Sequence, residues 1–195
     1  MNITNADYFT FNAYNSIFLT GKTGSGKTEF ARKLINNYEN AYTPKEMQYV
    51  IFDLKMVEFV GKDDCTPEYL YFSIITDSNY GLEKLEELAA IAKARTTLKN
   101  KPILFIYIEE CDMAYLDQQR FDNSVITINE HAKQANIKLI YSSSRVSPDT
   151  ISKKLLKSFD LILAGKLNND EAYAYLGIPK AKNLPPYSFT IIDKY

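Results

Sequence analysis

The sequence contains little of the chemistry that zinc binding and thiol catalysis require. Cysteine occurs only at Cys65 and Cys111, without the paired spacing of a metal site, and His131 is the only histidine. Four-ligand zinc sites and a Cys–His nucleophile are therefore disfavoured. Two cysteines that show no pairing pattern suit a reducing compartment, so we expect a cytoplasmic protein.

Long apolar runs and a strong net charge are also missing. The longest apolar runs, such as residues 103–108, are far shorter than the roughly 20 residues that a membrane-spanning helix needs, and no secretory signal pattern opens the chain. We therefore expect no intrinsic membrane segment. The formal net charge of −1 argues against a basic nucleic-acid coat protein or a polybasic membrane anchor.

Repeats, low-complexity tracts and Gly/Ser linkers are absent from the sequence as well, which predicts a single domain over residues 1–195. Short apolar runs predict buried strands at 16–20, 48–53, 102–108, 137–142 and 160–165. Helical spacing of apolar residues covers 28–38, 82–99 and 121–135. This alternation predicts an α/β fold with a mostly parallel sheet sandwiched by helices.

Three further segments complete this prediction. Residues 1–15 form an N-terminal extension in our interpretation. Residues 71–76 are expected either as an extra edge strand or as part of an insertion. Residues 183–195 are expected to hold a closing strand, since the two prolines at the start of this segment prevent a helix there.

One motif is present in full. Residues 21–28, GKTGSGKT, match the phosphate-loop pattern G-x-x-x-x-G-K-[ST] between a predicted strand and a predicted helix. Glycines let backbone N–H groups wrap phosphates, and the helix start adds partial positive charge. We expect a site for ATP or GTP with Mg²⁺, where Lys27 reaches the β- and γ-phosphates and the Thr28 hydroxyl holds the metal ion. The predicted nucleotide-binding residues are Gly21, Lys22, Thr23, Gly24, Ser25, Gly26, Lys27, Thr28 and Glu29.

A pair of acids follows a second buried strand. The apolar run 103–108 ends in Glu109–Glu110, and an acid at the carboxyl end of a buried strand is the Walker B arrangement. Glu109 is predicted to bind Mg²⁺, directly or through water, and Glu110 to orient and polarise the attacking water. Aspartate is usual at the first position, so Glu109 is one methylene longer. The adjacent second acid favours an ATPase that hydrolyses over a kinase that excludes water.

Three serines, Ser142, Ser143 and Ser144, follow another predicted strand. In ATPases with a catalytic glutamate, the strand between the phosphate-loop strand and the acid-bearing strand offers a polar sensor to the γ-phosphate. The serines are candidates for that role, although a serine run is also a common loop cap.

Residues 52–59, FDLKMVEF, resemble the Asp-Pro-Lys segment at the second strand of the FtsK/SpoIIIE branch of the FtsK–HerA ATPases. Leu54 stands at the proline, and the matching positions are Asp53, Lys55 and Glu58. Residues 158–177 are similar to the closing strand and helix of that family, with Lys166 at its lysine.

Residues 135–151 resemble a third family stretch, in which a strand is followed by Gln-Arg-Pro-Ser and then Asp. Ser144 stands at the glutamine and Val146 at the proline, while Arg145, Ser147 and Asp149 match. The resemblance covers about residues 16–192 and implies a RecA-like P-loop NTPase, with an additional strand and a catalytic glutamate. In this interpretation the catalytic residues are Lys27, Glu110, Ser143, Ser144 and Arg145.

The family resemblance further implies a hexameric ring, or a related oligomer, that threads double-stranded DNA and couples ATP hydrolysis to translocation. A DNA translocase, or a packaging or transfer ATPase of a mobile element or virus, is the leading hypothesis, recruited by a partner protein where it works at a membrane or a viral particle. The chain has only four arginines, of which Arg95 and Arg145 are candidates for an arginine finger.

Candidate DNA contacts are less specific. Residues 144–159 cluster basic side chains, which could contact phosphates or form a solvated helix face. Residues 111–123 offer a second candidate loop with Tyr115 and Arg120.

Three other functions stay open. A type VII secretion-like ATPase module would move polypeptide with the same fold. A small-molecule or nucleotide kinase is disfavoured by the scarcity of arginine after residue 95. A nucleotide-gated interaction module with little turnover is compatible with Glu109.

Overall fold

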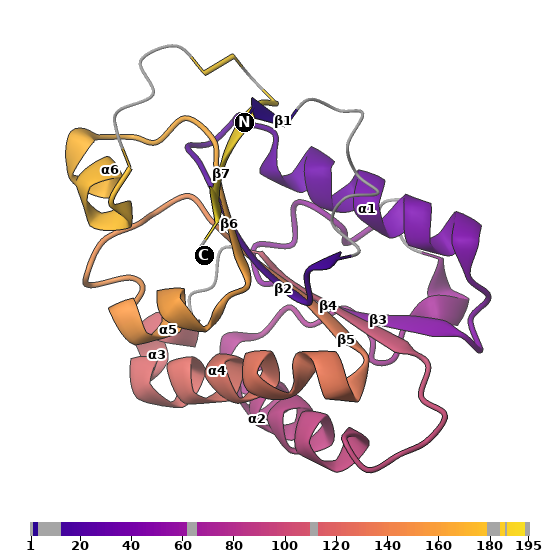
Figure 1. Cartoon of the computed structure of the whole chain (residues 1–195). Helices are drawn as coiled ribbons and strands as arrows, with labels where there is room; N and C mark the ends of the chain where they lie inside the picture. The colour runs from indigo at the N-terminus through magenta and orange to yellow at the C-terminus, as the bar shows by residue number, and fades with distance from the viewer. Residues whose placement is uncertain are drawn as a thin grey trace.

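A sheet of seven strands runs through the centre of the computed structural model, which describes residues 2–3, 13–61, 66–109, 113–178, 184–185 and 187–193. The strand order is β1-β7-β6-β2-β5-β4-β3 (Figure 1). The bounds are Asn2–Ile3 for β1, Ser16–Thr20 for β2, Met47–Asp53 for β3, Ile103–Glu109 for β4, Ile137–Ser143 for β5, Leu161–Ala164 for β6 and Phe189–Asp193 for β7.

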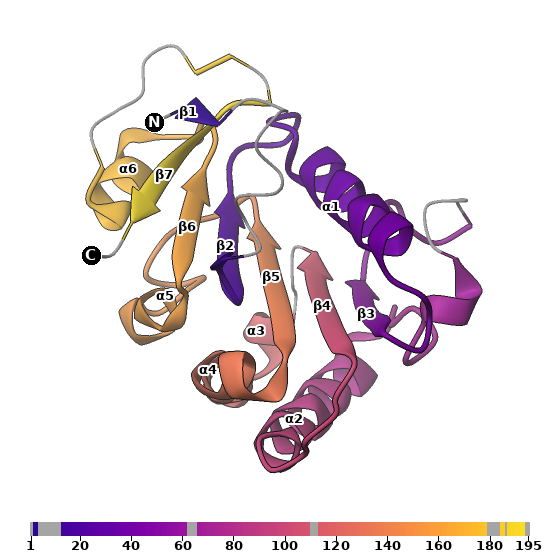
Figure 2. The same ribbon diagram turned by 45° about the vertical axis from the view of Figure 1, so that its right-hand side comes forward.

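Helices cover both faces of this sheet. The α1 helix and the short 3₁₀ helix η2 pack on one face, while α2, α4 and α5 lie on the other (Figure 2). The short helices α3 and α6 pack with the second group. The bounds are Lys27–Ala41 for α1, Pro67–Tyr69 for η2, Ser78–Arg95 for α2, Met113–Leu116 for α3, Gln118–Ala135 for α4, Lys153–Ser158 for α5 and Asp170–Leu176 for α6.

The five strands β6, β2, β5, β4 and β3 are parallel, as predicted from the strand–helix alternation. The predicted α/β fold with a mostly parallel sheet sandwiched by helices is therefore confirmed. The order β2-β5-β4 also places one strand between the phosphate-loop strand and the acid-bearing strand, which is the RecA-like arrangement expected with a catalytic glutamate. A parallel sheet brings the carboxyl ends of its strands to one edge, where ligands bind.

The two ends of the described chain close the sheet. The predicted closing strand is β7, which runs antiparallel to β6, and β1 in turn runs antiparallel to β7. Residues 71–76 form no regular strand. Together with the preceding Leu70, they follow the edge of β3 through two isolated bridges, which pair Leu70 with Tyr49 and Ile75 with Phe52.

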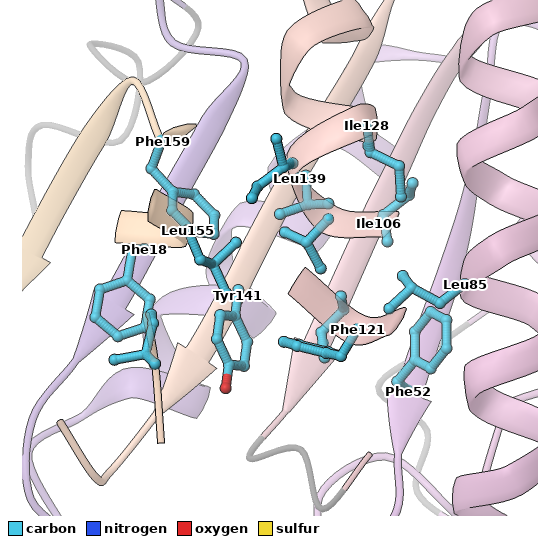
Figure 3. Close-up of a cluster of buried hydrophobic side chains, with 14 of the residues drawn as sticks. Phe18, Phe52, Leu85, Ile106, Phe121, Ile128, Leu139, Tyr141, Leu155 and Phe159 are labelled. Carbon is cyan, nitrogen blue, oxygen red and sulfur yellow. The ribbon is translucent and has the colours of Figure 1, made fainter. Parts of the chain in front are cut away.

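The larger core lies between the sheet and helices α2, α4 and α5 (Figure 3). Phe52, Ile106 and Leu139 project from three neighbouring strands toward the helices, and Leu85 and Phe121 meet them from α2 and α4. All five side chains are buried. Because each buried side chain of this size contributes about 1.5–3 kcal/mol, this core holds the carboxyl ends of the strands in fixed register.

Polar side chains cap the amino ends of most of the longer helices. Asp77 accepts a hydrogen bond from the Tyr80 N–H at 2.8 Å before α2, and Asp117 accepts one from the Arg120 N–H at 3.0 Å before α4. The α1 helix differs because its N-cap is Gly26, which has no side chain to accept the first N–H groups. A helix start of this kind is suited to an anion.

Candidate nucleotide-binding site

The phosphate loop connects β2 to α1 in a conformation that requires glycine. Gly24 and Gly26 have φ angles of 78° and 96°, in the left-handed region that other residues seldom adopt. A Cβ at Gly21 would lie 2.5 Å from Ser25 Oγ, and one at Gly26 would collide with the Tyr187 ring. The three glycines are therefore needed for the geometry of the loop and not only for its flexibility.

Neighbouring strands hold the loop in place. The Lys22 N–H donates to the Lys166 carbonyl at 2.6 Å, beyond the end of β6. The Tyr187 N–H donates to the Ser25 carbonyl at 3.1 Å, just before β7. The loop is thus attached on two sides to segments that are more than 140 residues away in the chain.

Lys27 is the first residue of α1 and is 6% exposed. Its Nζ donates to the Gly21 carbonyl at 2.9 Å and approaches the Lys22 carbonyl at 3.5 Å. The ammonium group therefore lies against the loop, where it is predicted to bind the phosphates of the nucleotide.

A cavity of about 470 Å³ opens beside this loop, a volume within the usual range for small-molecule sites. Lys27, Thr28 and Glu109 all line it, so the fold brings the phosphate loop and the acid-bearing strand to one place. The described lining residues are Thr23, Gly24, Gly26, Lys27, Thr28, Glu29, Arg32, Lys55, Val57, Glu58, Glu109 and Tyr187.

Glu109 ends β4 and is 7% exposed. Its carboxylate accepts hydrogen bonds from the Tyr107 hydroxyl and, at 3.4 Å, from the Ser142 hydroxyl. In the sheet register Glu109 lies beside Asp53 of β3 and Ser142 of β5. Two hydroxyl groups therefore orient the longer acid at the carboxyl edge of the sheet. Glu110, the predicted catalytic residue, lies outside the described residues.

Asp53 organises the loop that follows β3. Its fully buried carboxylate accepts backbone N–H bonds from residues 57–60, at 3.4, 3.1, 2.7 and 3.2 Å. Several N–H donors together can compensate the charge of a buried carboxylate. This loop brings Lys55, Val57 and Glu58 to the cavity.

Arg32 of α1 attaches the same loop to the helix. Its Nη2 donates to the Glu58 carbonyl and lies 3.3 Å from the Glu58 carboxylate, and its guanidinium lies 5.5 Å from the centre of the Phe59 ring. One wall of the cavity is therefore held by Asp53 from the sheet and by Arg32 from the helix.

The residues present fit a magnesium ion bound together with phosphates. Mg²⁺ prefers oxygen ligands and in nucleotide sites takes one or two carboxylates plus phosphate oxygens. The Thr28 hydroxyl and the Glu109 carboxylate line the same cavity. The described ranges hold no cluster of three or more His, Cys, Asp or Glu that could form an all-protein cage. Phosphate oxygens would therefore complete the coordination.

The predicted sensor serines have different surroundings. Ser142 contacts Glu109, as described above, whereas the Ser143 hydroxyl donates to the Arg145 carbonyl at 2.8 Å and accepts from the Arg145 N–H at 3.2 Å. Ser144 and Arg145 line a second cavity of about 350 Å³, beside Tyr115 and residues 167–169. Ser143, Ser144 and Arg145 are not among the described lining residues of the nucleotide cavity.

The two candidate finger arginines lie at opposite edges of the sheet. Arg145 is exposed at the carboxyl edge, where its Nη1 donates to the Tyr115 hydroxyl at 3.4 Å. Arg95 ends α2 and donates to the carbonyls of Ala135, at 3.0 Å, and Pro102, which precede β5 and β4 at their amino ends. Burial lowers the pKa of the Arg95 guanidinium. Arg95 is thus part of the packing at the edge remote from the phosphate loop.

The basic cluster predicted around residues 144–159 is divided. Lys153, Lys154 and Lys157 are exposed on α5, which lies near the amino end of β6 (Figure 2), whereas Arg145 follows the carboxyl end of β5. Arg120 is held by Glu86 through hydrogen bonds of 2.8 and 2.7 Å. The structure therefore brings Tyr115, and not Arg120, next to Arg145. No helix in the described part of the chain is both long and apolar enough to cross a bilayer.

Sequence reasoning missed three of the cavity residues. Arg32 and Val57 belong to patterns that predicted only a helix and a loop, and Tyr187 follows two prolines with no periodic signal. Lys55 and Glu58 were indicated only by the family resemblance. The contacts that bring these residues to the cavity join segments far apart in the chain.

Comparisons with known proteins identify the family and the fold. The sequence model of the FtsK/SpoIIIE family matches residues 2–102. A DNA translocase FtsK from Leptospira interrogans is 22% identical over 162 residues, covering 70% of this chain, and another from Streptococcus pyogenes is 20% identical over 176 residues, covering 76%. The chain spans only 17% and 22% of the lengths of these relatives.

Solved structures show the same fold at low identity. The conjugation coupling protein TcpA of pCW3, with ATPγS, has a TM-score of 0.70 and 19% identity over 92% of this chain and 57% of that one. EssC (ATPases 2 and 3) from Geobacillus thermodenitrificans has a TM-score of 0.68 and 16% identity over 92% and 38%. The genome packaging NTPase B204 from Sulfolobus turreted icosahedral virus 2, with ATP-gammaS, has a TM-score of 0.59 and 18% identity over 92% of each chain.

Proposed function

Because the chain belongs to the FtsK/SpoIIIE family, we propose that it binds and hydrolyses ATP and uses the energy to move double-stranded DNA. One observation carries this proposal: Lys27 of the phosphate loop and Glu109 of the neighbouring strand line the same cavity. A bound triphosphate there would be held from both sides. We propose that the protein works in the cytoplasm. ATP hydrolysis at this site would drive a DNA translocase or a packaging or transfer ATPase.

The residues of the cavity divide the work of binding. Backbone N–H groups of the loop and the start of α1 compensate the phosphate charge, and the Lys27 ammonium adds a positive charge beside them. Thr28 and Glu109 would hold Mg²⁺, which when bound neutralises charge on the phosphate oxygens. Tyr107 and Ser142 keep the Glu109 carboxylate oriented toward this task. Glu110 is proposed to orient and polarise the attacking water.

Arg145 is the better of the two finger candidates, because it is exposed at the edge where the nucleotide cavity opens. It lies beside a different cavity from the one that its own phosphate loop lines. We therefore propose that Arg145 acts on the nucleotide of a neighbouring copy, within a hexameric ring or a related oligomer. Ser143, which holds the Arg145 backbone from both sides, would position it, and Ser144 would sense the γ-phosphate across the same interface.

The choice of DNA as cargo follows from the relatives. The curated matches are DNA translocases, and the structural neighbours include a conjugation coupling protein and a viral genome packaging NTPase. Polypeptide is the second candidate cargo, because EssC and the type VII secretion ATPase EccC share the fold at comparable TM-scores. A recruiting protein is proposed for either cargo.

The test compares the ATPase rate with double-stranded DNA, with an unfolded polypeptide and with neither. We expect DNA to stimulate turnover and the stimulation to weaken as salt rises, because phosphate contacts release counterions. Glu110→Gln should keep ATP binding and lose hydrolysis, with Glu130→Gln on α4 as the matched control. Stimulation by polypeptide alone would assign the protein to the second class, and unchanged turnover in Glu110→Gln would show that another group activates the water.

A further inference from the structure

We propose that the Tyr187 side chain forms the base subsite of this nucleotide site, with its ring stacked on the base of the bound nucleotide. This inference rests on the proposed function, because it requires a nucleoside triphosphate on the phosphate loop. Tyr187 lies immediately before β7 and lines the nucleotide cavity. Among the described residues that line the cavity, it is the one aromatic side chain.

The position of Tyr187 is set by the phosphate loop itself. Its N–H donates to the Ser25 carbonyl at 3.1 Å, and its ring covers Gly26 so closely that a Cβ there would collide with it. Gly26 is the N-cap of α1, where the phosphates are predicted to bind. A base that is joined to these phosphates through its ribose remains close to the loop, and therefore within reach of the ring.

Tyr187 combines a strained backbone with an exposed ring. Its φ of 63° lies in the left-handed region, where a bulky side chain is strained. The residue is 51% exposed, although aromatic rings gain free energy from burial. Strained residues at a cavity commonly serve a ligand. A stacked base would cover the exposed ring and compensate part of this strain.

Stacking determines the class of ligand that the subsite accepts. Every base presents a π-face, so an aromatic platform adds affinity for any nucleotide and selects little among the bases. The hydroxyl group of Tyr187 is not needed for stacking. The subsite should therefore distinguish a nucleoside triphosphate from an inorganic triphosphate, and ATP and GTP should benefit similarly.

The test measures the affinities of ATP, GTP and inorganic tripolyphosphate by calorimetry in the presence of Mg²⁺. Tyr187→Gly removes the ring and suits the left-handed backbone, so the local conformation is retained. We expect this variant to weaken ATP and GTP binding by roughly tenfold, and tripolyphosphate binding by less than about twofold. Tyr187→Phe should bind all three like the parent. Tyr80→Ala, at an exposed tyrosine on α2, is the control and should change none of the affinities.

A fluorescence measurement provides a second readout. The chain contains no tryptophan, so Tyr187→Trp introduces a single reporter at the proposed subsite. We expect ATP to change its emission by stacking and tripolyphosphate to leave it unchanged.

Two results would overturn the inference while the proposed function stands. In the first, Tyr187→Gly binds ATP as tightly as the parent. In the second, ATP and tripolyphosphate binding fall together, which would show that Tyr187 only supports the phosphate loop. If the parent binds neither ligand, the proposed function fails and the base subsite fails with it. Tripolyphosphate binding by the parent therefore separates the two proposals.

Discussion

The two cavities at the carboxyl edge of the sheet differ in how their walls are held. At the nucleotide cavity, the lining residues Lys27 and Glu109 and the supporting Asp53 are nearly or fully buried, and each is hydrogen-bonded. In the cavity beside Arg145 the polar lining side chains, including Tyr115 and Asn168, are exposed or half-buried, and the buried lining residues are apolar. The buried groups of the first cavity are held in place by hydrogen bonds within one chain, whereas we propose that a neighbouring copy completes the second.

This difference separates binding from turnover. A buried and hydrogen-bonded site can bind its ligand without help, since its groups need little reorganisation. An exposed arginine contributes to catalysis only when it is brought to a nucleotide. We therefore expect changes in the first cavity to alter nucleotide affinity, and changes in the second to alter turnover alone.

Lys27→Ala should produce the largest effect. Removing the ammonium group from the phosphate loop is expected to weaken ATP binding by about 100-fold, the effect of roughly 3 kcal/mol, and to reduce turnover to background. Calorimetry and a phosphate-release assay would measure the two quantities. Lys33→Ala is the control, because Lys33 lies on the same helix but is not among the described lining residues of the cavity, and it pairs with Glu29 near the surface at 3.4 Å. Unchanged ATP affinity in Lys27→Ala would contradict the prediction that the nucleotide binds at this loop.

Arg145→Ala should show most clearly that the second cavity affects turnover and not ATP affinity. If Arg145 is an arginine finger, turnover should fall by about 10³-fold or more while ATP affinity stays within about twofold. The measurement is steady-state hydrolysis at a protein concentration that permits assembly. Arg120→Ala, at an arginine held by Glu86, should change neither quantity. A large loss of affinity in Arg145→Ala would contradict the separation.

Glu109→Gln should sharpen the assignment of the metal ligand. We expect affinity for ATP with Mg²⁺ to fall by about tenfold, since the amide is a poor magnesium ligand, while affinity in the presence of a chelator stays unchanged. Glu87→Gln on α2, in an exposed pair with Lys84, should leave both affinities unaltered. An equal loss with and without Mg²⁺ would assign Glu109 to the phosphates or to the fold.

Asp53→Asn should give the smallest effect on nucleotide binding. Its amide cannot accept as many N–H bonds from residues 57–60 as the carboxylate does, so the free energy of unfolding should fall by about 1–3 kcal/mol. Loosening this loop should weaken ATP binding only a few-fold, roughly threefold. Thermal unfolding and calorimetry would measure both. Asp77→Asn is the control, because asparagine caps a helix about as well as aspartate.

Local sequence signals predicted the parts of the molecule that depend on local geometry. The Lys27 ammonium contacts a carbonyl only six residues away, so the phosphate-loop pattern was sufficient to indicate this site. The apolar runs predicted the five parallel strands within one or two residues, because a strand buried on both faces must be apolar throughout. Segment 71–76 was predicted only as an edge strand or an insertion, and it lies beside the edge of β3 through isolated bridges without forming a ladder.

Contacts between distant segments were not predictable in the same way. Nothing in residues 183–195 indicated that Tyr187 would reach Gly26, because that contact requires β7 to return antiparallel beside β6. The family resemblance marked Asp53 and Glu58 without a role, and only the fold shows that Asp53 supports the wall to which Glu58 belongs. The separation of Arg95 from Arg145 likewise depends on the direction of the strands. The positions of the arginines in the sequence do not show at which edge of the sheet each one lies.

By itself the sequence determined where the phosphate loop and the acids that follow β4 lie along the chain. The glycines, Lys27 and the apolar strand specify these features within a few residues. Only the tertiary structure decided that Glu109, Asp53 and Ser142 stand side by side, and that Tyr187 covers the loop. The physical reason is that strand register and sheet order are set by the packing of the whole core, to which each segment contributes only a part.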